Sequence, residues 1–488
     1  MGAEMVGLSG GDGAGGGDTV ADRLAASLTA RIREGVFRPG DRLPSVRVLA
    51  RAEGVNPQTA VRALQMLEDA GLAEPRPRSG WFVRGARAGV TPQPGAGRPQ
   101  AVALPALARQ ILGDRHQPGL MAMGAALPGP DLLPITTLSR LHATALRQSG
   151  NDLLGRYSDP AGDPALRRAV ARMLEDRGLH RSPDEIIITN GCMEALDLAL
   201  AAVTAPGAVV AVESPAYYGV LLALAGRGLR VVELAADSQT GVSPAAVRAA
   251  LRAGDGAGGR LAACILSPAV HNPLGGSVPV AARQEIRRDL AGAGVPLIED
   301  DCFGFFHGPL ADPRPLLAFA GGDGMLCGSV SKTVGPGLRI GWIVPGRWYE
   351  EVVQISFRRH LSHPSPAQAV IARFLDSGGH ARLARRAVAE YTRRIDLLIA
   401  GLRRHMPQET TVAEPQGGMN LWLTLPQGLE AMAVMTAARR HGLSVVPGPL
   451  FSPVGGFASS LRLSVGSVGP EQIPEAVRRL AAAVADFR

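Results

Sequence analysis

Lys332 is the residue of this sequence whose side chain most directly suggests covalent chemistry. It is the only lysine among the 51 lysine and arginine residues of the chain. Arginine can replace lysine wherever a positive charge is sufficient, but a guanidinium group cannot lose its proton and attack a carbonyl carbon. One retained primary amine therefore indicates a Schiff-base nucleophile, and the alternative is a surface lysine kept by chance.

The residues around Lys332 favour the first interpretation. Ser329 supplies a hydroxyl group just upstream, and Gly335 and Gly337 allow a ligand to approach the backbone. Arg339 offers a planar fork of donors for a phosphate group. An aldehyde that carries a phosphate matches these features, and pyridoxal 5′-phosphate (PLP) is a cofactor of that kind.

Further candidate ligands follow apolar runs that we expect to be strands. Gly191, Cys192 and Met193 open a predicted helix directly after such a run, so their free N–H groups could bind the phosphate. Tyr217 follows another run and could stack on a planar ring, although a tyrosine in the core or on the surface is the commoner role. None of these residues is decisive alone.

Three polar residues complete the candidate site. Asn272 could donate a hydrogen bond to a phenolic oxygen, or it could serve only as a turn residue. Asp300 ends an apolar run, where a buried carboxylate could pair with a protonated pyridine nitrogen. Arg462 lies inside an apolar run, where it could grip a substrate carboxylate or form a structural ion pair.

Short apolar runs alternate with helical patterns from about residue 118 to residue 488. The runs lie at 185–189, 209–213, 264–267, 296–299 and 325–328. Such alternation predicts an α/β fold with a mostly parallel central sheet covered by helices on both faces. Ligands bind such sheets at the carboxyl ends of the strands, which is where the candidate residues stand.

Residues 19–85 predict a separate winged helix-turn-helix module. Helical patterns at 20–35, 46–52 and 57–70 precede two short strand-like runs at 72–74 and 81–83. Residues 19–87 contain twelve arginines against seven acidic residues, a net charge of +5. A basic module of this kind suits double-stranded DNA, with a helix in the major groove and arginines on phosphates. The alternative is a protein-contact domain with a solvated charged face.

The remaining features of the chain set limits. A length of 488 residues predicts two or more domains, and the net charge of +8 permits nucleic acid as a partner without demonstrating it. We expect residues 1–18 to be a disordered Gly-rich tail and residues 86–117 to be a linker. Absence of a long apolar run and of an export signal predicts a cytoplasmic protein without a membrane helix.

Four cysteines without metal-ligand spacing predict reduced thiols and no metal site: Cys192, Cys264, Cys302 and Cys327.

The N-terminal module resembles the GntR family of bacterial regulators. The match rests on Pro-Gly-Asp-Arg-Leu-Pro-Ser at 39–45, Gly-Val-Asn-Pro-Gln-Thr at 54–59 and Leu-Glu-Asp-Ala-Gly-Leu at 67–72. By this resemblance the DNA contacts fall on Arg42, Ser45, Arg47, Gln58, Thr59, Arg62 and Gly80.

Residues 120–488 resemble the fold-type I aminotransferases, which have a smaller C-terminal α+β subdomain. The motifs are Thr-Asn-Gly-Cys-Met-Glu-Ala at 189–195, Asn-Pro-Leu-Gly at 272–275, Glu-Asp-Asp at 299–301 and Gly-Ser-Val-Ser-Lys-Thr-Val-Gly-Pro-Gly-Leu-Arg at 328–339. The resemblance implies that Lys332 forms an internal aldimine with PLP and that Ser329 and Arg339 bind its phosphate. It also implies that Tyr157 reaches the phosphate of the neighbouring subunit.

The sequence departs from the aminotransferase pattern at one place. The family usually has a tyrosine two or three residues after the first aspartate, hydrogen-bonded to the phenolic oxygen of the cofactor. Cys302 and Phe303 occupy these positions. Loss of that donor predicts an altered proton equilibrium at the cofactor and weakened catalysis.

A GntR module upstream of an aminotransferase-like domain is the arrangement of the MocR subfamily. The resemblance implies a head-to-tail homodimer that regulates transcription and senses PLP, or an amine or amino acid, through an aldimine at Lys332. Gly219 stands where sensors of γ-aminobutyrate have an arginine, which disfavours that effector. Two alternatives stay open: a working aminotransferase with an appended DNA-binding domain, and a domain that binds PLP alone.

Overall fold

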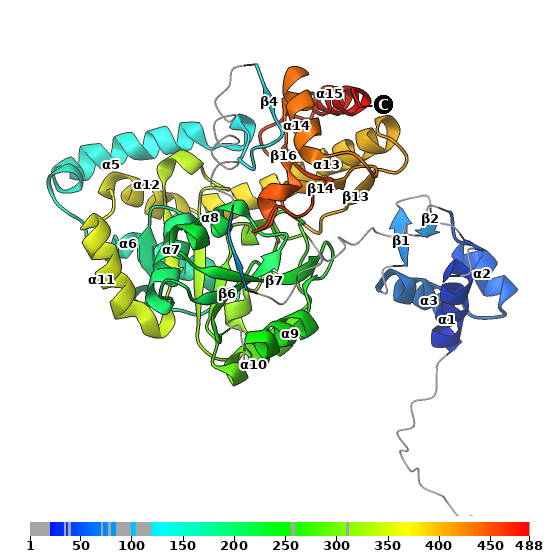
Figure 1. The fold of residues 1–488 in the computed structure, drawn as a ribbon, viewed down its shortest axis with the longest axis horizontal. Helices are drawn as coiled ribbons and strands as arrows, with labels where there is room; N and C mark the ends of the chain where they lie inside the picture. The colour runs from blue at the N-terminus through cyan, green and yellow to red at the C-terminus, as the bar shows by residue number, and fades with distance from the viewer. Residues whose placement is uncertain are drawn as a thin grey trace, which may run out of the picture. The chain divides into compact units, whose positions relative to one another are not determined.

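The computed structural model describes residues 20–33, 36–37, 41–69, 72–76, 80–83, 99–103, 119–254, 259–308 and 312–487. The expected tail at 1–18 and most of the expected linker at 86–117 lie outside these ranges. The chain divides into two compact units, residues 1–87 and residues 88–488 (Figure 1).

The described residues of the first unit form three helices and a two-stranded antiparallel sheet. The elements are α1 (Val20–Arg33), α2 (Val46–Ala52), α3 (Pro57–Asp69), β1 (Ala73–Arg76) and β2 (Gly80–Val83). Apolar side chains from all three helices form its core, among them Leu28, Leu49 and Leu64. The predicted winged helix-turn-helix is thereby confirmed.

Local sequence explains where the turn of this motif lies. The Ser45 side chain caps α2 by accepting a hydrogen bond from the N–H of Val48. Gly54, with φ +63°, makes the turn after α2, since a left-handed backbone favours glycine. Pro57 then begins α3, where a missing N–H costs nothing.

The second unit is built on a nine-stranded sheet. The strand order is β3 (Gln100–Ala101), β7 (Arg230–Asp237), β6 (Val209–Ser214), β9 (Leu261–Leu266), β10 (Leu297–Asp300), β11 (Gly324–Ser329), β12 (Gly341–Val344) and β5 (Ile187–Thr189), with β8 (Gly241–Val242) beside β7. The five strands from β7 to β11 run parallel to their neighbours, whereas β12, β5, β3 and β8 pair antiparallel. The predicted mostly parallel sheet is confirmed.

One part of the expected linker belongs to this sheet. Residues 99–103 fall within 86–117, yet Gln100 and Ala101 pair with Val231 and Arg230 of β7. The prediction was wrong for these residues because a two-residue edge strand is held by its pairing partner rather than by a recognisable local pattern.

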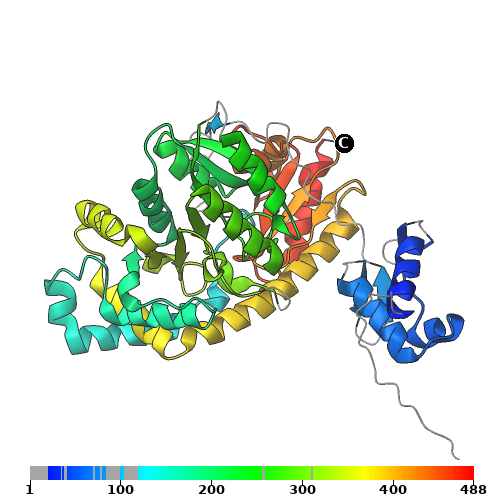
Figure 2. The same ribbon diagram turned by 90° about the horizontal axis from the view of Figure 1, so that it is seen from below.

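Alternate residues of the central strands face two different helical layers. Val210, Val212 and Ile265 face the layer of α7 (Cys192–Val203), α8 (Tyr218–Gly226) and α11 (Tyr349–His360). Val209 and Leu266 face the layer of α9 (Pro244–Gly254) and α10 (Val280–Ala293). Both faces of the sheet are therefore covered, as parallel strands with continuous apolar runs require (Figure 2). Three further helices cover the β12–β5 end: α5 (Ile135–Gly155), α6 (Pro164–Glu175) and α12 (Ser365–Asp376).

A smaller α+β subdomain follows the sheet, as predicted. Its four-stranded sheet has the order β13 (Thr411–Ala413), β14 (Asn420–Thr424), β17 (Ser460–Ser464) and β16 (Val446–Pro447). The helices α13 (Gly379–His405), α14 (Ala431–Arg440) and α15 (Ile473–Ala485) share its core. A two-stranded parallel pair joins β4 (Met121–Ala122) to β15 (Leu443–Ser444).

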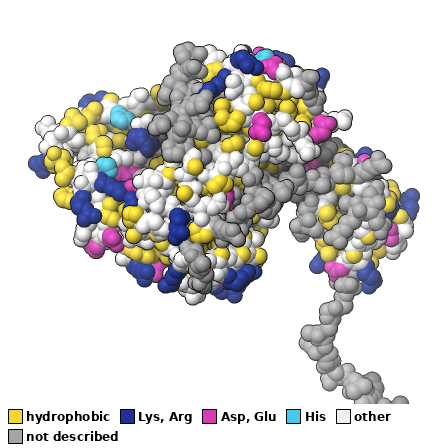
Figure 3. Space-filling view, in the orientation of Figure 1, with side chains coloured by type: hydrophobic (Ala, Val, Ile, Leu, Met, Phe, Trp, Pro, Cys, Tyr) yellow, Lys and Arg dark blue, Asp and Glu magenta, His cyan; other side chains and the backbone are white. Residues whose placement is uncertain are grey.

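The surface of the second unit is of mixed character. Arginines are interspersed with acidic and apolar side chains on the visible face (Figure 3). Among the described helices, none combines the length and the apolar composition that crossing a bilayer requires.

Candidate cofactor site and DNA-binding surface

A pocket of about 190 Å³ lies at the carboxyl ends of the parallel strands. Asp300 ends β10 and Ser329 ends β11, so the polar residues predicted at strand ends meet at one edge of the sheet. Nine of the residues predicted to bind cofactor or substrate line this pocket: Cys192, Met193, Tyr217, Asn272, Asp300, Ser329, Lys332, Arg339 and Arg462.

Lys332 lies in the turn that follows β11. Its Nζ donates a hydrogen bond to the carbonyl oxygen of Ala126 at 2.7 Å. The same atom lies 5.6 Å from the centre of the Phe303 ring. The lysine is therefore a partly buried amine within the pocket rather than a surface charge.

One end of the pocket has the features of a phosphate cradle. Gly191 (φ +88°) precedes α7, and the N–H groups of Cys192 and Met193 in the first turn have no acceptor within the helix. The Arg339 guanidinium donates to the carbonyl oxygen of Asn190 and stands 3.4 Å from Ser331 Oγ. A Cβ atom at Gly191 would lie 2.5 Å from Arg339 Nη2, so glycine is needed for this close approach. Free N–H groups, a helix N-terminus and a guanidinium fit a phosphate.

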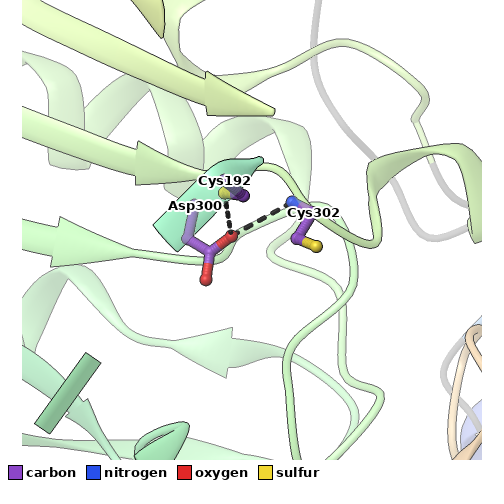
Figure 4. A group of neighbouring side chains, drawn as sticks. All are labelled: Cys192, Asp300 and Cys302. Carbon is purple, nitrogen blue, oxygen red and sulfur yellow. Dashed lines mark hydrogen bonds between the residues drawn. The ribbon is translucent and has the colours of Figure 1, made fainter. Parts of the chain in front are cut away.

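Asp300 has the position expected for the partner of a pyridine nitrogen. Its Oδ1 accepts hydrogen bonds from the backbone N–H of Cys302 at 3.1 Å and from Cys192 Sγ at 3.4 Å (Figure 4). Burial raises the pKa of this carboxyl group, while those hydrogen bonds and the charge of Lys332 lower it. A partly buried carboxylate in such a place is stabilised by a cation brought in by the ligand.

The other predicted ligands also have suitable surroundings. Asn272 is buried, and its Oδ1 accepts a hydrogen bond from Asn420 Nδ2 at 3.2 Å, which leaves its own Nδ2 to donate. Tyr217 stands immediately before α8, with its ring 4.7 Å from that of Tyr218. Arg462 in β17 is buried and donates to the carbonyl oxygen of Gly124.

The two residues that replace the usual tyrosine both line the pocket. Phe303 is buried and brings a ring without a hydroxyl group. Cys302 Sγ lies 3.7 Å from Ser329 Oγ. The neighbouring Cys192 thiol lowers the pKa of Cys302, and the charge of Lys332 acts in the same direction.

Two predicted residues do not line the pocket. Gly191 lies behind its wall, against Arg339. Tyr157 lies between α5 and α6, and 81% of its surface is exposed. Its expected contact with a neighbouring subunit stays a prediction.

Sequence reasoning missed two clusters. Glu213 Oε2 lies 3.5 Å from His271 Nε2 and accepts a hydrogen bond from the N–H of Ser267 at 2.6 Å. Burial raises the pKa of Glu213 to about 8 and lowers the pKa of His271 to about 3, so both are uncharged near pH 7. The position of His271 directly before Asn272 was the available signal. The second cluster is the pair of thiols beside Asp300, which spacing alone does not reveal because Cys192 and Asp300 are 108 positions apart.

The residues predicted to contact DNA lie on the first unit. Arg42, Arg47, Gln58 and Arg62 are exposed, and Gln58 and Arg62 share one face of α3 because they are four residues apart. Ser45 is exposed, with its hydroxyl group in the cap of α2. Thr59 is half-buried on α3. Gly80, with φ +99°, packs against the Arg42 side chain at the start of β2.

A winged helix-turn-helix joined to an α/β unit with a lysine pocket at the carboxyl edge of its sheet defines a DNA-binding protein with an aminotransferase-like domain. Residues 20–83 match the family of bacterial regulatory proteins named gntR, and residues 136–480 match aminotransferase class I and II. The chain belongs to the MocR subfamily of GntR-family regulators, and its cofactor is pyridoxal 5′-phosphate.

Individual relatives agree with this assignment. The uncharacterized HTH-type transcriptional regulator YjiR of Escherichia coli is 32% identical over 468 residues, which cover 94% of this chain and 98% of YjiR. The probable rhizopine catabolism regulatory protein MocR of Rhizobium meliloti is 28% identical over 446 residues, which cover 87% of this chain and 85% of that protein. The crystal structure of LysN, an alpha-aminoadipate aminotransferase of Thermus thermophilus complexed with N-(5′-phosphopyridoxyl)-L-leucine, has a TM-score of 0.71 at 28% identity. That similarity covers 78% of this chain and 95% of LysN.

Proposed function

We propose that this chain is a PLP-dependent transcriptional regulator whose DNA binding responds to PLP, or to an amine or amino acid, through the amine of Lys332. The observation that carries this proposal is the single pocket that gathers Lys332, Asp300 and Arg339 in a chain that also has a GntR module. A metabolic enzyme has no need of such a module.

Each part of the pocket has a distinct role in this proposal. The N–H groups of Cys192 and Met193 bind the cofactor's phosphate together with Ser329 and Arg339, and Gly191 makes room for the guanidinium. Asp300 pairs with the pyridine nitrogen, Asn272 donates a hydrogen bond to the phenolic oxygen and Tyr217 stacks on the face of the ring. Arg462 binds the carboxylate of an effector.

Lys332 supplies the covalent attachment. When bound, PLP provides an aldehyde that reacts with amines and a ring that withdraws electrons. Lys332 would hold the cofactor covalently through Nζ, which must be an uncharged amine for that linkage to form, and the carbonyl oxygen of Ala126 orients Nζ by accepting its hydrogen bond. An effector amine competes with Lys332 for the same position.

The signal reaches DNA through a homodimer in this proposal. Tyr157, with its exposed ring, contacts the phosphate site of the other subunit, and the subunits associate head to tail. An effector that favours one arrangement of the two large units changes the distance between the two winged helix-turn-helix modules. Affinity for DNA depends on how well that distance matches the spacing of the two half-sites. Such a regulator acts in the cytoplasm, where bacterial DNA lies.

The first experiment tests attachment of the cofactor. Because Lys332 is the only lysine, borohydride reduction of PLP-loaded protein should label one known position, and a lysine-specific protease should then no longer cut there. The Lys332→Arg variant, which keeps the charge, should take no label. A label elsewhere, or none, contradicts the proposed role of Lys332.

The second experiment tests regulation. DNA fragments from upstream of the protein's own gene are titrated with PLP-loaded protein, with and without a panel of amines and amino acids. The salt concentration is held constant, because affinity for DNA depends strongly on it. Footprints should change with PLP or with an amine that alters the visible absorbance. Equal binding to all DNA fragments, unchanged by any of these ligands, contradicts the proposal.

A working aminotransferase is the second candidate, and Arg462 in the pocket favours it. Phe303 opposes it because the ring cannot donate a hydrogen bond. Steady-state assays with an amino acid and a keto acid decide between them, since ordinary enzymes turn over about 1–1,000 times per second.

A further inference from the structure

Cys192, Asp300 and Cys302 bring three metal-ligand atoms together in the cofactor pocket. Their two sulfur atoms and one carboxylate oxygen all lie within 4.8 Å of one another. Figure 4 shows the three side chains as neighbours, with two hydrogen bonds ending on one oxygen of Asp300. In a tetrahedral zinc site, with Zn–S of about 2.3 Å and Zn–O of about 2.1 Å, a sulfur and an oxygen ligand are about 3.6 Å apart and two sulfur ligands about 3.8 Å apart. Cys192 Sγ and Asp300 Oδ1, at 3.4 Å, are already close to that separation.

The backbone holds Asp300 and Cys192 in regular elements and Cys302 in the turn after β10. Asp300 is the last residue of β10 and pairs with Cys327 of β11. Cys192 is the first residue of α7, and its Sγ lies 3.4 Å from the carbonyl oxygen of Cys327. The N–H of Cys302 is bonded to Asp300 at 3.1 Å. The three donor atoms therefore come from fixed backbone positions and lie within 4.8 Å of one another.

We propose that these side chains bind a thiophilic divalent cation of the Zn²⁺ class, and that this cation and PLP exclude each other. The exclusion rests on the proposed function, because it takes Asp300 as the partner of the cofactor's ring nitrogen. A carboxylate oxygen that coordinates a metal ion cannot also hold a protonated pyridine nitrogen at the same place.

The donor set determines the class of metal. Two thiolates favour zinc or cadmium over magnesium and calcium, which prefer oxygen ligands. Three protein ligands leave a fourth position for water from the pocket, whereas structural zinc sites have four protein ligands. Each thiol gives its proton to solvent when the metal binds. The two thiolates and the carboxylate are then balanced by the divalent ion together with the ammonium group of Lys332, which lines the same pocket.

Cobalt(II) is the probe for the first test, because thiolate coordination gives it a charge-transfer absorbance that Zn²⁺ lacks. The full chain freed of PLP should develop this absorbance, lose it when Zn²⁺ is added and keep it when Mg²⁺ is added. Cys192→Ser and Cys302→Ser should each weaken cobalt binding more than about 100-fold, since even partners that only orient a metal ligand are worth 10- to 100-fold. Cys264→Ser is the matched control, because Cys264 is buried in β9 and does not line the pocket. No absorbance in the wild type, or equal absorbance in Cys302→Ser, overturns the proposal.

X-ray absorption of the zinc-loaded wild type gives a measurement that needs no variant. It should find two sulfur neighbours, and a shell of only oxygen and nitrogen overturns the proposal.

The exclusion is tested with protein whose PLP has been fixed to Lys332 by borohydride. This protein should bind cobalt at least about tenfold more weakly than the PLP-free chain, and equal binding overturns the exclusion. The cobalt measurements use neither DNA nor an amine. An absent DNA response therefore contradicts only the proposed function, whereas an absent cobalt absorbance contradicts only the metal site.

Discussion

The amine of Lys332 lies beside the face of the Phe303 ring, with Nζ 5.6 Å from the ring centre. An ammonium group within about 6 Å of an aromatic face gains about 0.5–2 kcal/mol of cation–π attraction. A phenyl ring also cannot donate a hydrogen bond to a ligand next to Lys332. One residue thus affects both the nucleophile and the electronics of the cofactor.

Phe303→Tyr should restore the missing donor. A hydroxyl group that donates to the phenolic oxygen stabilises its negative charge, so the cofactor's linkage to Lys332 should lose its proton at lower pH. A hydrogen bond to a charged group contributes about 1.5–3 kcal/mol, which corresponds to about one to two pH units. The visible absorbance of PLP-loaded protein, titrated with pH, measures this midpoint. Phe305→Tyr is the control, since Phe305 packs against Arg177 and His380 outside the pocket, and equal midpoints in the two variants would refute the prediction.

Gly191→Ala should weaken cofactor binding. The glycine has φ +88° and ψ 171°, a conformation that costs other residues about 1–3 kcal/mol, and its added Cβ would meet Arg339 Nη2 at 2.5 Å. Displacement of this guanidinium should reduce PLP affinity about tenfold or more, as measured by equilibrium dialysis. Gly226→Ala in α8, where a Cβ has nothing within 4 Å, should leave affinity unchanged. A similar loss of PLP affinity in both variants would mean that the close approach of Arg339 to Gly191 is not responsible.

The strand-end residues of the pocket could be predicted because each lies in a short local motif. Lys332 with Arg339, and Asp300 with Glu299, are close in sequence, and a parallel sheet brings the ends of its strands to one edge. Ser45 and Pro57 likewise marked the starts of α2 and α3 through backbone chemistry that is local.

Features that depend on tertiary proximity could not be predicted in this way. Cys192 meets Asp300 only because α7 begins beside the end of β10, and no spacing rule covers 108 positions. The Gln100–Ala101 strand has no periodicity of its own and is defined by β7. The closeness of Glu213 and His271 follows from the adjacency of β6 and β9, which alternation of strands and helices does not specify.

Arg62→Ala and Gln58→Ala should affect DNA binding in different ways. Loss of an arginine that contacts phosphate should weaken binding to all sequences and reduce the salt slope by about one. Loss of a glutamine that contacts a base edge should cost about 1–3 kcal/mol at one operator position and relax specificity there. Fluorescence anisotropy over a range of salt concentrations separates the two effects. Arg252→Ala, an exposed change in α9, is the control. Unchanged salt slopes and specificity in both variants would exclude α3 as the reading helix.

Glu213 should make the large unit less stable as pH rises above neutrality. Burial, with repulsion from Asp300 and Glu299, raises its pKa from 4.5 to about 8. Between these values the folded protein keeps a proton that the unfolded chain releases, so stability falls as pH rises through this range. His271 acts in the opposite direction between about 3 and 6.5, because burial lowers its pKa and the unfolded chain binds a proton that the folded protein does not. The two effects oppose each other from 4.5 to 6.5, and the loss caused by Glu213 stands alone from 6.5 to 8.

Glu213→Gln removes that titration while it keeps the shape of the side chain. Urea unfolding at pH 6.5 and pH 8 should therefore show a smaller loss of stability in this variant than in the wild type. Glu351→Gln, at an exposed position of α11, should behave like the wild type. If Glu213→Gln lost as much stability as the wild type over this range, the proton on Glu213 would not be the cause. The pH dependence would then have to come from other titrating groups of the unit.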